Sequence, residues 1–301
     1  MNRNLVRLFA LLLITITTQF AYAGAHSSNK RPVVTVSVEK QAELQSWFDD
    51  FTGNMDDKYF GQVGSLNGAL DFEDRTFETE WSKFEVRVTR GDVVEKTGRM
   101  FSVGKKLSPG RGEGVLTWGR FYSLDMHPKS PLVGMLHATI VMQMFEDNSV
   151  VTGGWLGVMP GTKVEEDLAL LKKVADDYFE RHGKDPTLYR TLICKGTHDT
   201  KTEFRRKPAC SGVSFYGPPV YRGDSEASIK FIAGLYEEFV AAYMATVEDR
   251  ADDPVTAEDL AAQAHMRRSW LIDQLFSDPY AAKIIPFKIW SFANVAPTVK
   301  F

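Results

Sequence analysis

Two histidines, an aspartate and two hydroxyl residues are concentrated in one short part of the chain. They are Ser123, Asp125, His127, His137 and Thr139. Side chains alternate between the two faces of a strand, so the first three share one face of a strand ending near Pro128. The last two share a face of the strand that follows. If the two faces coincide, one sheet surface carries two imidazoles, a carboxylate and two hydroxyls.

This set of side chains is compatible with three interpretations. A histidine beside an aspartate suits general acid–base chemistry, because the carboxylate orients the imidazole and fixes its tautomer. Two imidazoles and a carboxylate are also a set of metal ligands. The third interpretation is a solvated polar face of a sheet without a function. The spacing alone leaves all three open.

Paired arginines are a second candidate feature. They occur as Arg205-Arg206 and as Arg267-Arg268. The planar guanidinium group matches a carboxylate, so an arginine pair near a pocket indicates an acidic ligand. Adjacent residues of a helix do not share a face, so at most one of Arg267 and Arg268 points at a given site. The alternative is that these arginines only keep the surface soluble.

The N-terminus predicts export. Arg3 and Arg7 precede an apolar run from Leu8 to Ile16, and Ala21-Tyr22-Ala23 provides small residues for cleavage after Ala23. We therefore expect residues 1–23 to be a signal peptide and the mature protein to be exported, most simply to a periplasm. An uncleaved anchor is the alternative, although the apolar run is short for a membrane span.

The charge of the chain argues against nucleic acid as a partner. Without Arg3 and Arg7, 34 basic residues face 39 acidic ones, which leaves a net charge of −5. Because the basic residues are dispersed, no patch suited to a phosphate backbone is formed. The two cysteines, Cys194 and Cys210, either form a disulfide in an oxidising compartment or remain as two buried thiols.

Hydrophobic periodicity predicts one α+β domain over residues 39–301, after a flexible lead-in at 24–38. Strands are expected at 84–88, 116–127, 135–145 and 150–158, and their short connections indicate an antiparallel meander. Helices are expected at about 39–52, 225–248 and 256–276. Another should start with a Thr162–Glu165 capping box and stop at Gly183. Residues 184–220 look irregular, with one short strand near 213–215. We expect a large antiparallel sheet with helices on both faces.

Several motifs resemble one enzyme family in the same order along the chain. Residues 91–102, GDVVEKTGRMFS, resemble the family segment GGVFEKAGVNFS. Residues 122–131 with His137 resemble VSLVIHPRNP…H, and residues 153–157 with 165–167 resemble WWFGGG…EEDA. Residues 264–276 take the place of a late helix with a double arginine. The chain thus resembles oxygen-dependent coproporphyrinogen III oxidase over roughly residues 40–301.

The resemblance implies a function and a set of site residues. The family converts two propionates of a reduced tetrapyrrole to vinyl groups with O2, without an organic cofactor or an essential metal, usually as a homodimer. By this resemblance His137 is the proton donor, with Asp125 beside it as a substitute for a family aspartate. The residues that would contact the substrate are Ser123, His127, Thr139, Arg206, Arg267 and Arg268.

The chain also departs from the family pattern. The paired aspartates of the family correspond here to Tyr216 and Gly217, and an arginine after the second histidine corresponds to Val141. The alternative function is therefore a periplasmic protein on the same fold that binds a tetrapyrrole or another small acidic ligand without catalysis. Neither function involves a membrane after the signal peptide has been removed.

Overall fold

The computed structural model describes residues 35–108, 113–195, 208–276 and 285–301. All of them belong to one compact unit, Val33–Phe301. The expected signal peptide and most of the expected lead-in lie outside the described residues, as do Arg205 and Arg206. Among the helices that the structure describes, none is both long and apolar enough to cross a membrane.

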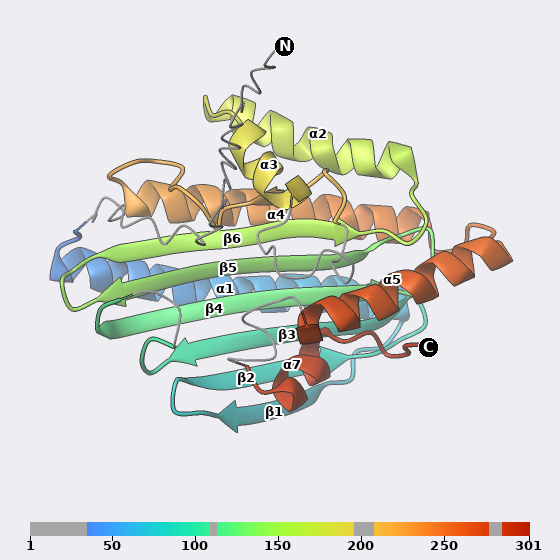
Figure 1. Ribbon diagram of the computed structural model, residues 1–301, viewed down its shortest axis with the longest axis horizontal. Coiled ribbons are helices and arrows are strands. Elements are labelled where there is room, and N and C mark those ends of the chain that lie inside the picture. The colour runs from blue at the N-terminus through green and yellow to red at the C-terminus, as the bar shows by residue number, and fades with distance from the viewer. Residues whose placement is uncertain (1–34, 109–112, 196–207, 277–284) are drawn as a thin grey trace, which may run out of the picture. The chain divides into compact units, whose positions relative to one another are not determined.

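The described fold is built on an antiparallel sheet whose seven strands follow one another in chain order (Figure 1). The strands are β1 Glu73–Glu78, β2 Ser82–Thr89, β3 Val94–Gly104, β4 Leu116–Pro128, β5 Met135–Phe145, β6 Val150–Met159 and β7 Val213–Ser214. The predicted meander is confirmed. Strand β1 was not expected, because only Phe77 of its six residues is even half-buried. A charged, exposed strand of this kind is typical of a sheet edge.

Helices cover both faces of the sheet, as the sequence predicts. They are α1 Val38–Asn67, α2 Glu165–Arg181, α3 Thr187–Lys195, α4 Ser225–Asp249, α5 Ala257–Phe276 and α7 Phe287–Asn294. In Figure 1, α1 and α4 lie behind the sheet, and α5 and α7 lie in front of it. Tyr122 of β4 packs on Tyr236 of α4 with a centroid distance of 6.1 Å, whereas the next residue, Ser123, contacts Asn294 of α7.

Helix α1 is longer than the predicted segment 39–52. Beyond Gly53 the apolar stripe continues with Met55, Tyr59 and Val63, which are buried in the main core. Burial of this face outweighs the low helix propensity of the glycine. The helix ends at Gly68, whose φ of 69° lies in the left-handed region that glycine adopts without strain.

Two predicted helix starts have different outcomes. The expected Thr162–Glu165 capping box is wrong, because the Thr162 hydroxyl donates to Asp259 over 2.7 Å and α2 begins at Glu165 without a side-chain cap. The start expected near residue 256 is confirmed: α5 begins at Ala257, and the Asp259 amide donates to Thr256 Oγ1 over 3.2 Å. Helix α3 lies within residues 184–220, which the sequence predicts to be irregular.

Cys194 and Cys210 form a disulfide, with their Cα atoms 5.1 Å apart. The bond joins the end of α3 to the residues preceding β7. We expect the substitution of both cysteines by serine to lower the free energy of unfolding by about 2–3 kcal/mol. Without the bond, the unfolded chain is no longer closed into a loop and gains conformational entropy. Urea denaturation of both proteins measures this difference. A variant as stable as the oxidised wild type would show that the bond contributes nothing.

Candidate functional site

The five polar residues of β4 and β5 lie on one face of the sheet, as predicted. In the register of the two strands, Asp125 stands opposite His137 and Ser123 stands opposite Thr139. We call these four residues, together with His127, the polar face. Four of the five are buried, and His137 is half-buried. The interpretation of a solvated sheet face is therefore wrong for these residues.

Asp125 and His137 form a hydrogen-bonded pair at the centre of the polar face. His137 Nδ1 lies 2.7 Å from Asp125 Oδ1. The carboxylate can only accept, so Nδ1 carries the proton and Nε2 is left to exchange protons with a ligand. The Asp125 side chain is 0% exposed and the His137 side chain is 15% exposed, so the imidazole is the accessible member of the pair.

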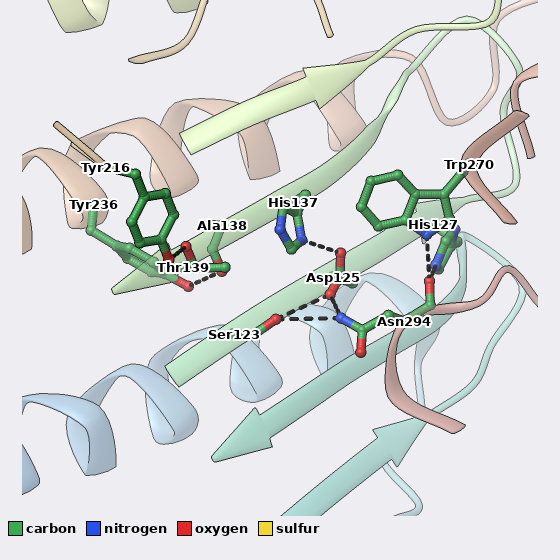
Figure 2. Close-up of polar contacts among 10 residues, drawn as sticks. All are labelled: Ser123, Asp125, His127, His137, Ala138, Thr139, Tyr216, Tyr236, Trp270 and Asn294. Atoms are coloured by element: carbon green, nitrogen blue, oxygen red, sulfur yellow. Dashed lines mark hydrogen bonds and ion pairs between the residues drawn. The ribbon is translucent and has the colours of Figure 1, made fainter. Parts of the chain in front are cut away.

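The C-terminal end of α7 covers this pair. The Asn294 side-chain amide donates to Asp125 Oδ2 and to Ser123 Oγ, the latter over 3.3 Å, and Ser123 Oγ donates to Asp125 Oδ2 over 3.2 Å (Figure 2). The main-chain oxygen of Asn294 accepts from Trp270 Nε1 over 2.9 Å. The Trp270 ring lies 5.2 Å from the His137 ring, centroid to centroid. Asn294 therefore covers Asp125, and Trp270 borders the His137 ring without burying it completely.

His127 does not share the environment of His137. Its Nε2 donates to the main-chain oxygen of Asn294 over 3.1 Å, and its Nδ1 has no hydrogen-bond partner in the described part of the chain. Burial lowers the pKa of His127 well below its ordinary value, and the nearby cations Lys96 and Arg267 lower it further. His127 is consequently neutral and anchors α7.

Lys96 is a buried cation that sequence reasoning missed. Its Nζ donates to the main-chain oxygens of Val295 over 2.5 Å and of Ser291 over 3.4 Å, at the C-terminal end of α7. A positive charge is favourable there because the helix dipole is negative at this end. The pKa of Lys96 is lowered to about 7, mainly because the side chain is buried.

The remaining predicted site residues lie apart from the pair or are bound to other protein groups. Thr139 Oγ1 lies 2.8 Å from the hydroxyl of Tyr216. Arg267 is buried, pairs with Glu95 and donates to the Pro128 oxygen over 3.2 Å. Arg268 is only half-buried and reaches the main-chain oxygen of Lys300 over 3.4 Å. The two arginines diverge as expected for adjacent helix residues, and Arg206 lies outside the described residues.

An open groove lies further along the same strands. Phe121 and Val141, which are paired across β4 and β5, belong to its lining and follow Ser123 and Thr139 on the same face. The groove combines apolar rings and chains with hydroxyl, amide and cationic groups, and its volume of about 600 Å³ includes space that is open to solvent. Other lining residues include Phe84, Ser82, Ser102, Gln143 and Ile285. Such a mixture suits a ligand with an apolar body and polar substituents.

The donor groups do not form a metal site within the described residues. There, no group of three or more histidine, cysteine, aspartate or glutamate side chains is placed to hold an ion. In particular, His127 and His137 do not converge, because His127 Nε2 is bound to Asn294 and His137 Nδ1 to Asp125.

No known family model matches the chain, and no curated protein sequence matches it. The resemblance to coproporphyrinogen oxidase therefore stays a prediction.

One sequence signal could have located α7 over the polar face. Gly98 stands opposite Asp125 in the register of β3 and β4. A Cβ atom there would lie 1.9 Å from the main-chain oxygen of Ala293 in α7. A glycine inside a strand often marks the close approach of another backbone. Asn294 itself gave no such signal, because it ends an apolar, aromatic segment.

Proposed function

We propose that this protein is an oxygen-dependent oxidase acting on a porphyrinogen or a similar macrocyclic acid. The observation that carries the proposal is the Asp125–His137 pair, in which a buried carboxylate fixes the tautomer of an accessible imidazole. His137 Nε2 exchanges a proton with the substrate, and Asp125 stabilises the imidazolium that forms.

The groove further along β4 and β5 supports a substrate with apolar and polar parts, although neither Asp125 nor His137 belongs to its lining. Its rings can contact the faces of a macrocycle, and its hydroxyl and amide groups can bind polar substituents. The reaction needs no redox group from the protein. On one propionate, a C–H bond breaks at the carbon next to the ring and the bond to the carboxylate breaks to release CO2, so the vinyl double bond forms and two electrons pass to O2. The proton from that C–H bond and one proton from solution complete hydrogen peroxide. The chain supplies desolvation, orientation and proton transfer.

A direct assay tests this function. Purified protein is mixed with coproporphyrinogen III under air and under argon, and the products are separated by chromatography. We expect conversion to vinyl-bearing products under air only. No conversion above the rate without protein, at a substrate concentration that saturates binding, would contradict an enzymatic role.

A second candidate function is binding without catalysis, and one observation favours it. Ser123 and His127, which the resemblance places against the substrate, are buried and already bonded to Asn294 of the same chain. Saturable quenching of tryptophan fluorescence by coproporphyrin III, without any turnover of the porphyrinogen, would support this alternative. Export and a homodimer remain predictions of the sequence.

A further inference from the structure

We propose that Asn294 is a positioning residue for the Asp125–His137 pair. A single residue contacts two of the groups that border the His137 ring. Its side chain donates to Asp125 Oδ2, and its main-chain oxygen accepts from Trp270, whose indole ring packs at 5.2 Å from the imidazole (Figure 2). The effect of Asn294 on catalysis rests on the proposed function, whereas its effect on the state of His137 does not.

The contact with Asp125 decides which carboxylate oxygen faces the imidazole. Oδ2 accepts from Asn294 and from Ser123, which leaves Oδ1 for His137 Nδ1. A carboxylate without these donors can rotate about its bond to Cβ, and its hold on Nδ1 becomes weaker. Neutral histidine would then populate the Nε2-protonated tautomer, in which Nε2 can no longer accept a proton.

The position of Asn294 is itself fixed from three other elements. Lys96 of β3 binds the main-chain oxygens of Ser291 and Val295, on either side of Asn294 in the chain. His127 of β4 and Trp270 of α5 donate to the Asn294 oxygen. A side chain held at its backbone in this way loses little further freedom when it binds Asp125, which favours a positioning role.

The test is to replace Asn294 by alanine and to measure the tautomer of His137 by nitrogen NMR on histidine-labelled protein. Ser291→Ala is the control, because only the main chain of Ser291 takes part in the contacts. We expect Asn294→Ala to shift the ratio of the two neutral tautomers about tenfold, the value of one hydrogen bond to a charged group. The turnover number should fall in proportion to the fraction of His137 that loses its Nδ1 proton, with KM nearly unchanged, and the control should change neither the tautomer ratio nor the turnover.

The outcomes separate this inference from the proposed function. An altered tautomer in a protein without turnover supports the positioning role and removes the oxidase. An unchanged tautomer in a folded variant overturns the positioning role, whatever the activity. If Asn294→Ala does not fold, Asn294→Leu, which has a similar volume but cannot donate a hydrogen bond, carries the same test with the same expected shift.

Discussion

Replacing Asp125 by asparagine is expected to lower the turnover of a porphyrinogen about 10²–10⁴-fold. An amide in this place must either present its NH2 group to His137 Nδ1 or oppose the amide of Asn294 with a second donor. The first arrangement forces the wrong tautomer on His137, and the second leaves a donor clash in a buried site. Steady-state kinetics with coproporphyrinogen III measures the effect.

The control for this prediction is a carboxylate on the opposite face of the sheet. Asp56 of α1 accepts from the Tyr122 hydroxyl over 3.0 Å and pairs with Arg99. Asp56→Asn also removes a partly buried charge, but it leaves the polar face intact, so its turnover should remain within about twofold. Equal turnover in the two variants, both folded by circular dichroism, would remove Asp125 from the mechanism.

Lys96 should make the stability of the protein rise with pH. Burial lowers its pKa from 10.5 to about 7 in the folded state, and repulsion from Arg90 adds to the shift. Attraction to Asp125 and Glu73 opposes it. Between these two pH values the unfolded chain binds a proton that the folded chain does not, so the free energy of unfolding increases with pH.

The size of the Lys96 effect can be measured against Lys96→Met. Between pH 7 and pH 10 the wild type should gain about 3–4 kcal/mol relative to this variant, which keeps a long apolar side chain but cannot titrate. Urea denaturation of both proteins at several pH values gives the difference, in which other titrating groups cancel. If the free energies of unfolding of the two proteins changed with pH in parallel, Lys96 would have an ordinary pKa beneath α7.

The sheet could be predicted because the residues that determine it lie close together in the sequence. Alternation along 116–127 and 135–145 places Ser123, Asp125 and His137 on defined faces, and the short connection between the strands aligns those faces. Strand β1 and the second half of α1 were missed for opposite reasons. The strand buries almost none of its side chains. The helix contains Gly53, whose low helix propensity predicts that the helix ends there.

Gly98 indicates that another backbone approaches the polar face, but which segment covers it could not be predicted. Asn294 and Asp125 are 169 residues apart in the sequence, and nothing near Asn294 indicates a polar partner. Lys96 looks like an ordinary strand lysine until α7 is placed over it. The sequence therefore predicts the carboxylate and the imidazole, but only the tertiary structure shows that a helix end encloses them.

The role of His137 is tested most directly by the release of CO2 from coproporphyrinogen III labelled in its propionate carboxyl groups. The wild type and His137→Ala are compared under air, with His182→Ala, an exposed histidine at the end of α2, as the control. We predict labelled CO2 and oxygen uptake from the wild type and the control, and a rate at least about 10²-fold lower from His137→Ala. Equal release from all three proteins would contradict proton transfer by the Asp125–His137 pair.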